Sequence, residues 1–478
     1  MFFIMDVCEG WIMSICQSGV DRKVQAGDVL VNVTEQHPLI LLSQSLSWQT
    51  LVDAVLPDLK KTKKGCWWLG RKLKIRTHLG VYLLQQLFNK TDRQIEYDLK
   101  DNAAYQLFCG IGIVEKWHVP DHTKIEEFRS RLSEETHKCL ANLMVKRAVQ
   151  LGFADPSNVD IDSTVQEANM HYPADSCLLK KLGAMSNKVA YFLNKTLKDC
   201  LNTPLVVNMK KISSVSRDYF FLPKNTAKEV KNSKMMALLN VVIEETSAVI
   251  NQCKHLGADF IAKSPWGIKR TIEQINALSE KYIADVGYFL TERMVAPAKA
   301  LSFHLKEVAC FTKGKLGKKY QFGRCVQLGR IDGNFLFVPK STSVQMSDKT
   351  SLPAIIECHQ ELFEGAAINS VGTDKGYYSA ANEKYLQEQG VNEIAIQRPK
   401  NIKKQPLNPL LKDREEALVN RRSGIEPLIG HIKQGGQLGR SRMKSDKGIE
   451  SSGYTAVLGF NIRQLIRCQK PPDRLKIA

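Results

Sequence analysis

The feature that most constrains the fold is a change of hydrophobic period at residues 158–164, which read Asn-Val-Asp-Ile-Asp-Ser-Thr. Apolar and acidic residues alternate there, as in a β-strand, whereas the preceding residues follow helical spacing. On a strand, Asp160 and Asp162 point to the same face. Two acids on one face are costly to bury without a cation or a partner. The segment therefore predicts a strand that carries a candidate carboxylate site.

Further strands are expected after a long helical stretch. The expected elements are, in chain order, strands at 319–328 and 334–340, a helix at 353–363, a strand at 367–374, a helix to residue 390 and a strand at 393–397. Asp332-Gly333, which joins the first two, is a strong hairpin signal. Strands that alternate with helices indicate an α/β fold. Residues 177–313 are mostly helical and are expected to form an insertion between strands.

The N-terminal third has a different pattern. Residues 47–152 are expected to form an all-helical module, with capping boxes at Thr91–Gln94 and Thr123–Glu126 as helix starts. Basic residues interleave with Trp67 and Trp68, which suits a nucleic-acid surface; a solvated loop beside a charged helix explains them equally well. Residues 1–46 are expected to be an N-terminal extension, whose first segment, Met1 to Cys16, is expected to have little structure and to be no signal peptide.

Composition narrows the partner class. At 478 residues the chain can hold two or three domains. Its 68 Lys and Arg exceed its 49 Asp and Glu, and the net charge of +19 favours nucleic acid first and an anionic membrane second. No apolar run reaches the roughly 20 residues that span a bilayer, so no membrane partner is expected. The 12 cysteines form no Cys-x-x-Cys pair, which favours reduced thiols in a cytoplasmic protein.

A second candidate site lies in residues 420–433. Read as a helix, this stretch places Glu426 on one face with Arg422, four residues before it, and Lys433, seven after it. One carboxylate among cations suits a metal ion beside a phosphate. The alternative is structural, because Ser423-x-x-Glu426 is also a capping box at a helix start.

The order of the elements brings the acids together. One carboxylate falls on the first strand, one at the end of the fourth strand at Asp374, and one on the last helix at Glu426. This order matches a ribonuclease H-like core with a mixed sheet, in which these positions converge on one edge. Three carboxylates can hold two Mg²⁺ ions, for which Mn²⁺ can substitute, in phosphodiester cleavage.

Six segments occur in an order that identifies a family. They are Pro120-Asp-His-Thr-Lys-Ile-Glu-Glu-Phe-Arg129, Asp162-Ser-Thr-Val165, Tyr172-Pro-x-Asp175, Thr373-Asp374-Lys-Gly-Tyr-Tyr-Ser379, the Arg422, Glu426 and Lys433 set, and Gly459-Phe-Asn-Ile-Arg463. Together they resemble bacterial insertion-sequence transposases of the IS5 type, a DDE group, over residues 48–467. The family often has a tyrosine three residues before the arginine, where this chain has Val419.

The resemblance implies a set of site residues. Asp162, Asp374 and Glu426 would be the catalytic, metal-binding triad, and Arg422 and Lys433 would hold DNA phosphates near the scissile bond.

The first acid has two rivals, Asp160 and Asp175. The match of Asp-Ser-Thr to the family motif favours Asp162, with Asp160 as a structural acid that supports the site.

Further DNA contacts are expected at four residues. Lys375 and Tyr377 directly follow Asp374, although a tight turn explains the Gly-Tyr-Tyr run almost as well. Arg440 and Arg442 lie on a glycine-rich basic loop, for which a solvated loop is the alternative.

The implied function is transposition of an insertion sequence. The protein would bind the terminal inverted repeats as a homodimer or larger synaptic assembly, cut double-stranded DNA at the element ends, and join the 3′-hydroxyls to target DNA. It would act in the bacterial cytoplasm, at the nucleoid. Two alternatives are a catalytically inactive, transposase-derived repressor and a structure-specific nuclease on the same core.

The sequence thus predicts four regions. They are an extension at 1–46, an all-α DNA-binding domain at 47–152, a ribonuclease H-like catalytic core at 153–176 and 314–470, and a helical insertion at 177–313.

Overall fold

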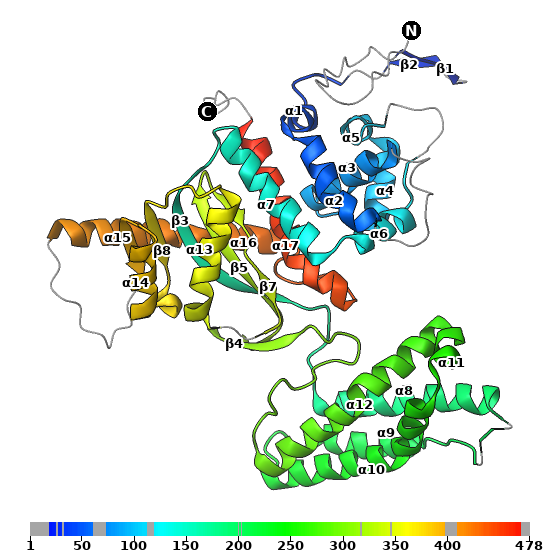
Figure 1. Ribbon diagram of the computed structural model, residues 1–478. Helices are drawn as coiled ribbons and strands as arrows, with labels where there is room; N and C mark the ends of the chain where they lie inside the picture. Colours follow the sequence, from blue (N-terminus) through cyan, green and yellow to red (C-terminus); the bar gives the residue numbers. More distant parts are fainter. Residues whose placement is uncertain are drawn as a thin grey trace. The chain divides into compact units, whose positions relative to one another are not determined.

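The computed structural model describes residues 19–24, 27–30, 33–60, 73–111, 119–198, 200–201, 203–315, 318–344, 347–396 and 409–469. The chain divides into two compact units (Figure 1). The first, which we call the sheet unit, comprises residues 1–168, 311–443 and 447–478. The second, the helical unit, comprises residues 169–310 and 444–446.

A mixed β-sheet forms the centre of the sheet unit, with the strand order β4-β5-β3-β8-β9. The five strands are β4 (Ala309–Lys315), β5 (Lys318–Asp332), β3 (Asp155–Glu167), β8 (Ser370–Thr373) and β9 (Glu393–Ile396). Strand β3 is antiparallel to β5 and parallel to β8, which is parallel to β9. Two short strands, β6 (Phe335–Phe337) and β7 (Ser341–Thr342), also pair with β5. The fold is mixed α/β, consistent with the expected ribonuclease H-like core.

The predicted strand is confirmed as part of β3, in which Val159 and Ile161 flank Asp160 and are completely buried. The predicted hairpin is also confirmed between β5 and β6. Gly333 and Asn334 in the turn both have positive φ, at 85° and 61°, a backbone conformation that glycine and asparagine adopt more readily than other residues. A Cβ at Gly333 would lie 2.2 Å from the carbonyl oxygen of Phe153, so glycine is needed there for space as well.

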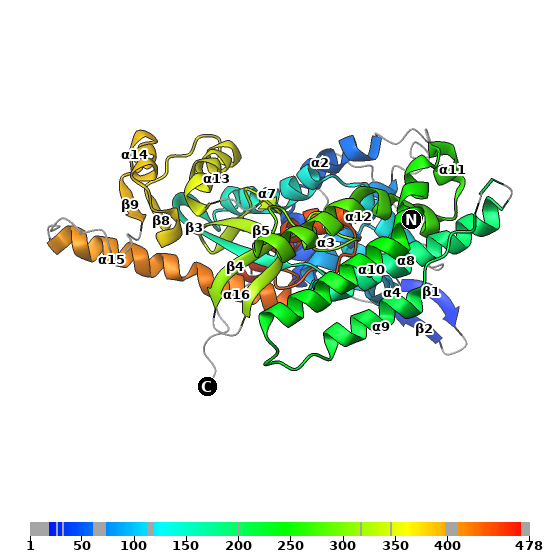
Figure 2. The same cartoon turned by 90° about the horizontal axis from the view of Figure 1, so that it is seen from below.

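Five helices follow the hairpin in the chain. They are α13 (Asp348–Leu362), α14 (Ala380–Glu388), α15 (Pro409–Ser423), α16 (Ile425–Gly435) and α17 (Asp446–Cys468). Figures 1 and 2 show α15 beside β8 and β9, which it contacts. The Asn461 side chain of α17 accepts a hydrogen bond from the Leu336 amide in β6 and donates one to the Leu336 carbonyl oxygen. A Cβ at Gly459 would lie 2.3 Å from the carbonyl oxygen of Gln86, so α17 also packs closely on the N-terminal helices.

The N-terminal part of the sheet unit is mainly helical. Its elements are β1 (Gly19–Val24), β2 (Gly27–Leu30), α1 (Pro38–Ser45), α2 (Trp48–Lys60), α3 (Leu73–Leu87), α4 (Asp92–Asp101), α5 (Ala103–Phe108), α6 (His122–Arg131) and α7 (Glu134–Gln150). One cluster of buried apolar residues extends from Val33 through these helices and the sheet to Leu465. The N-terminal helices therefore share a core with the sheet.

Two details of the N-terminal expectations need correction. The capping box at Thr91 and Gln94 is confirmed, but α6 begins after Asp121, whose carboxylate accepts hydrogen bonds from the main chain of Thr123 and Lys124. An aspartate two residues upstream thus takes the capping role predicted for Thr123. Helix α1, inside the extension predicted at 1–46, buries Leu39, Ile40 and Leu42 in the core shared with the following helices, so the helical module begins before residue 47. Met1 to Cys16 lies outside the described residues. Trp67 and Trp68 lie outside the described residues.

Across the described ranges, no single helix is long and apolar enough to cross a membrane. Helices α1 and α2 reach that length and composition only as a pair, which is bent by 71°.

The helical unit has a hydrophobic core of its own. Its helices are α8 (Asp175–Thr196), α9 (Met209–Phe220), α10 (Lys228–His255), α11 (Ala258–Lys263) and α12 (Trp266–Glu292). Helix α12 ends at Arg293, which has a left-handed backbone conformation with φ of 61°. The expected helical stretch to residue 313 is wrong at its end, because β4 begins at Ala309 and pairs with β5.

Candidate active site

Parallel pairing of β3 with β8 places two of the predicted acids on neighbouring strands. The register pairs Asp160 with Gly372 and Ile161 with Thr373. The next residue on β3 is Asp162, and the residue directly after β8 is Asp374. Both lie at the carboxyl end of the parallel pair. Asp374 follows the last residue of β8, and its carboxylate accepts a hydrogen bond of 2.9 Å from the Gly376 amide. The two strands therefore hold both acids at the same end of the sheet, where the parallel pairing of β3 and β8 stops.

Glu426 reaches the same end of the sheet through Arg422. The Arg422 guanidinium donates from Nη2 to Asp162 Oδ2 and from Nη1 to Glu426 Oε1, each at 3.0 Å. The Arg422 and Asp162 side chains are only 9% and 15% exposed, whereas that of Glu426 is 63% exposed. One arginine thus links the acid of β3 to the acid of α16.

The capping-box alternative for Ser423 and Glu426 is not what the structure shows. Helix α15 ends at Ser423, α16 begins at Ile425, and the Ser423 hydroxyl donates to the Val419 carbonyl oxygen. Gly424 between the helices keeps a right-handed helical conformation. Arg422 and Glu426 therefore keep their four-residue helical spacing across the junction, as the one-face interpretation expected.

Asp160 is held in a buried network of its own. Only 3% exposed, it accepts hydrogen bonds from Arg421 Nη2 at 2.8 Å and from Arg330 Nη1 at 3.3 Å. Arg421 also donates to the Ser370 hydroxyl of β8, and Arg330 to the Arg421 carbonyl oxygen. Burial raises the pKa of Asp160, and the two arginines oppose this rise. Asp160 thus ties the end of α15 to the sheet.

The other rival, Asp175, belongs to the helical unit. It is the first residue of α8 and pairs with Lys299 at 2.8 Å and with the Tyr282 hydroxyl at 3.1 Å. Asp160 and Asp175 are both engaged in local networks, and of the three candidates only Asp162 shares Arg422 with Glu426.

An acid that the sequence interpretation missed, Asp348, lies beside Asp374. Ser163, the neighbour of Asp162, donates from its hydroxyl to Asp348 Oδ1 at 3.2 Å. A Cβ at Gly376 would lie 2.8 Å from Asp348 Oδ2 and 3.1 Å from Asp374 Oδ1, so the two carboxylates flank this glycine. Asp348 is the first residue of α13 and follows a polar segment, so no local pattern marked it.

Tyr377 lies behind these acids rather than on the surface. Its side chain is completely buried in a short 3₁₀-helix, η2 (Lys375–Tyr377), and its hydroxyl has no hydrogen-bond partner among the described residues. Burial, and then the carboxylates of Asp348, Asp162 and Asp374, raise the pKa of Tyr377. The ring is therefore not presented to DNA, and the tight-turn alternative describes this segment.

The remaining predicted cations surround different parts of the site. Lys375 is exposed directly after Asp374, and Lys433 is half-buried on α16. Arg440 is exposed and pairs through its main chain with Glu167 at the end of β3. Arg442 is exposed, and its guanidinium donates to the Asn89 carbonyl oxygen at 3.0 Å, so it also contacts the N-terminal helices.

Comparison with protein families decides the class of this chain. Residues 28–131 match the family model "Transposase domain (DUF772)", and residues 308–462 match the "Transposase DDE domain". The second match contains Asp374, Arg422, Glu426 and Lys433. The chain belongs to the insertion-sequence DDE transposases. Searches of curated proteins and of solved structures each found no match.

The acids of this transposase fit a hard divalent cation by their chemistry. DDE transposases generally use divalent metal ions, and carboxylate oxygens are the ligands that Mg²⁺ prefers. Within the described ranges, no three His, Cys, Asp or Glu side chains are close enough together to hold a metal ion. Arg422 is at present the cation between Asp162 and Glu426, so a metal ion at these acids would compete with that guanidinium.

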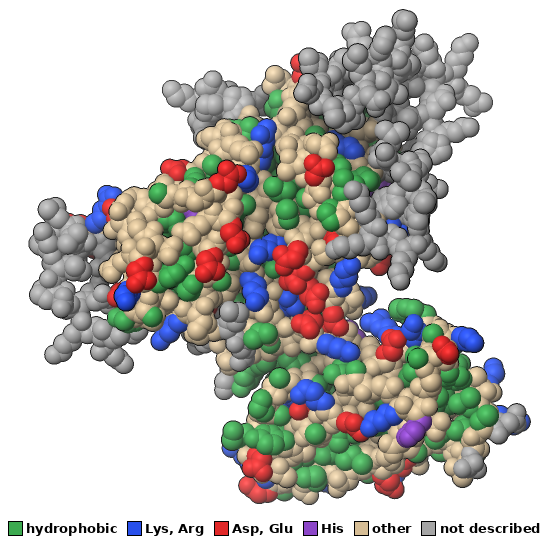
Figure 3. Space-filling view, viewed as in Figure 1, with side chains coloured by type: hydrophobic (Ala, Val, Ile, Leu, Met, Phe, Trp, Pro, Cys, Tyr) green, Lys and Arg blue, Asp and Glu red, His purple; other side chains and the backbone are tan. Residues whose placement is uncertain are grey.

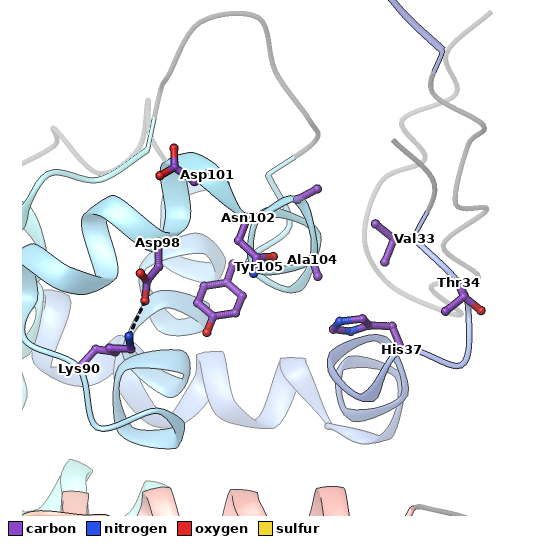
Figure 4. Close-up of a pocket in the computed structure, with 10 residues that line it drawn as sticks. Val33, Thr34, His37, Lys90, Asp98, Asp101, Asn102, Ala104 and Tyr105 are labelled. Carbon is purple, nitrogen blue, oxygen red and sulfur yellow. Dashed lines mark hydrogen bonds and ion pairs between the residues drawn. The ribbon is translucent and has the colours of Figure 1, made fainter. Parts of the chain in front are cut away.

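A pocket of about 720 Å³ lies elsewhere in the sheet unit. It is lined by α4, α5 and the segments that precede α1 and α4 (Figure 4). His37, Asn102 and Tyr105 line it, together with the ion pair of Lys90 and Asp98 at 3.3 Å. No residue of the predicted triad belongs to it, so we do not assign it to the chemistry.

Proposed function

We propose that this transposase is of the IS5 type and cuts DNA at the ends of its element with Asp162, Asp374 and Glu426. The observation that carries the proposal is the link made by Arg422 between Asp162 and Glu426, beside the strand end that bears Asp374. Asp162 and Glu426 share one guanidinium and Asp374 follows the strand paired with β3, which supports assigning these three acids, from a β-strand, a strand end and a helix, to one reaction.

Mg²⁺ would be held by these three carboxylates, and Mn²⁺ would substitute for it. When bound, such ions activate the attacking oxygen and stabilise the leaving oxygen of an in-line displacement. The residues of the chain supply the rest. The three acids would hold these cations, and Lys433, Lys375 and Arg440 would neutralise the phosphates that flank the scissile bond.

The N-terminal helices have a separate part in the proposal. Residues 47–152 would bind the terminal inverted repeats, with two or more copies of the chain bringing the element ends together. The match to a transposase domain over residues 28–131 supports this assignment. The same acids would then serve hydrolysis and joining to target DNA, because both are in-line displacements at phosphorus. The reaction would take place at the bacterial nucleoid, in the cytoplasm.

The test is a joining assay with the full chain, a labelled duplex that carries the element terminus, a target plasmid and Mg²⁺. We expect cut ends with 3′-hydroxyls and a labelled product covalently joined to the plasmid. Cutting without joining would favour the nuclease alternative. Specific binding without cutting, with Mg²⁺ or with Mn²⁺, would favour the repressor.

A further inference from the structure

The helical unit carries a group of basic side chains around an exposed tryptophan. Trp266 begins α12 and is 75% exposed. The Arg270 guanidinium lies 5.5 Å from the centroid of its ring. Almost the whole helical unit lies between the two matched family ranges, so neither match assigns a role to this surface.

Packing of α8 against α12 brings two lysines to the same place. The Lys188 ammonium donates to the carbonyl oxygen of Gly267, next to Trp266, at 3.3 Å. Lys181 precedes Lys188 by seven residues and so lies on the same face of α8. Burial, and then the charge of Arg270, lower the pKa of Lys181, which places these two cations close together. We call Trp266, Arg270, Lys181 and Lys188 the Trp266 cluster.

Three other cations of the helical unit are neutralised by acids. Lys211 pairs with Glu244 at 2.7 Å, Lys254 with Glu280, and Lys281 with Asp285 at 3.5 Å. By contrast, the structure gives Lys181, Lys188 and Arg270 no ion pair with an acid anywhere in the described ranges. Like charges held together repel each other, and a polyanion would remove that repulsion.

The exposed indole narrows the class of polyanion. A cation pair beside an aromatic ring suits a nucleic acid, because the cations bind phosphates while the ring packs on a sugar or a base. Transposases act on DNA, which makes duplex DNA the available ligand of this chemistry. Figure 3 shows basic, acidic and hydrophobic side chains interspersed on the visible face of the helical unit.

We propose that the Trp266 cluster is a DNA-binding surface, additional to the carboxylate site, that holds the phosphate backbone of duplex DNA without reading its sequence. The cluster offers ammonium, guanidinium and indole groups, which suit phosphates and sugars rather than a defined set of base edges. The inference rests on the proposed function only in taking DNA as the substrate.

The test uses the full chain, EDTA to prevent cutting, and fluorescence anisotropy of a labelled duplex of unrelated sequence at several salt concentrations. Lys188→Gln/Arg270→Gln is compared with Lys211→Gln/Lys254→Gln, which removes the same charge from paired cations of the same unit. The first variant is expected to bind about tenfold more weakly and to lower the slope of log affinity against log salt by up to about 0.9 per cation. The paired-cation control is expected to keep the native slope.

Trp266→Ala gives an independent readout. It removes the aromatic contact and no charge, so it should weaken binding by about fivefold or more and leave the salt slope unchanged. Thermal unfolding of each variant checks that the helical unit is folded.

Equal losses in both double variants would overturn the proposal, because net charge alone would explain them. Native affinity for DNA in the cluster variants would also overturn the proposal. So would cluster variants that still bind DNA but no longer bind anionic vesicles or an acidic peptide. A native chain that binds DNA but never cuts would refute the proposed function and leave the cluster's effect on affinity to be judged by itself.

Discussion

Arg422 is the residue on which the site geometry depends most. Its guanidinium is shared by two carboxylates from different elements, and only Glu426 is largely in solvent. The contact with Asp162 is therefore the stronger half, because ion pairs weaken with exposure to water. We expected Arg422 to hold a DNA phosphate; here it neutralises the acids that a metal ion would need.

Replacing Arg422 should separate metal binding from cutting. In Arg422→Gln the two acids lose their counter-ion, so we expect tighter Mn²⁺ binding without DNA, measured by electron paramagnetic resonance. Cutting should fall about 100-fold or more, because a cation near the transferring phosphate is lost. Arg422→Lys keeps the positive charge but loses the planar guanidinium that reaches both acids. Its Mn²⁺ affinity and its cutting rate should lie between those of the native chain and Arg422→Gln. Unchanged metal affinity in Arg422→Gln would contradict this view of the ion pair.

Gly376 tests whether Asp348 belongs to the site. A methyl group at Gly376 would press on the carboxylates of Asp348 and Asp374, at 2.8 Å and 3.1 Å. We expect Gly376→Ala to reduce the cutting rate by at least about tenfold, since small displacements of catalytic groups are costly. Gly430→Ala on α16 is the matched control, because its Cβ would meet nothing within 4 Å. Full cutting activity of Gly376→Ala would show that the positions of Asp348 and Asp374 beside this glycine do not limit the reaction.

At the scale of elements, the site depends on how α15 is attached to the sheet. Asp160 on β3, Arg330 on β5 and Arg421 on α15 form the attachment. A Cβ at Gly424 would lie 2.6 Å from the Arg330 guanidinium, so a glycine lets that side chain pass below the helix junction. This attachment fixes the helix end from which Arg422 and Glu426 project.

Alanine substitutions of Asp160 and Asp162, which are two residues apart, should therefore have different effects on stability and on cutting. Asp160→Ala leaves two partly buried arginines without their acid and should lower the free energy of unfolding by about 3 kcal/mol in urea denaturation. Asp162→Ala leaves Arg422 paired with Glu426, so it should cost less stability and abolish cutting. If Asp160→Ala is fully stable and Asp162→Ala unfolds, the assignment of the two acids is reversed.

The pairing of α3 with α7 predicts a pH dependence. Tyr82 on α3 and His137 on α7 are buried and share a hydrogen bond of 2.7 Å. Burial lowers the pKa of His137 from 6.5 to about 3. The unfolded chain therefore takes up a proton below pH 6.5 that the folded chain takes up only near pH 3. The free energy of unfolding should decrease as the pH is lowered through this window.

The measurement is urea denaturation between pH 6.5 and 3.5 for the native chain and for His137→Gln. Removing this histidine should reduce the slope of unfolding free energy against pH by about 1.4 kcal/mol per unit, the value for one proton. Equal slopes would show that His137 is protonated in the folded protein.

For the molecule as a whole, the sequence revealed the features whose cause is local. The alternation around Asp162, the Asp332-Gly333 hairpin signal and the helical spacing of Arg422 and Glu426 each depend on a few neighbouring residues, and the structure has all three. Asp374 at a strand end follows for the same reason, since a strand boundary can be read from a short segment.

Features that depend on distant contacts could not be read in this way. Asp348 reaches Asp374 only because α13 returns to the end of β8. The choice of Asp121 over Thr123 as a cap, and the shared core of α17 with the N-terminal helices, are set by tertiary packing. The elements that carry Asp162, Asp374 and Glu426 were thus predictable one by one, whereas the network around these acids was not.

The most direct test of the central claim is metal-dependent cutting of a labelled duplex that carries the element's own terminus. The native chain is compared with Asp162→Ala, Asp374→Ala and Glu426→Ala, each with Mg²⁺ and with EDTA. We predict cutting at the terminus by the native chain with Mg²⁺ only, and no cutting by any of the three variants while terminus binding is retained. Undiminished cutting by any one of these variants, or by the native chain in EDTA, would contradict the assignment of the three acids to the reaction.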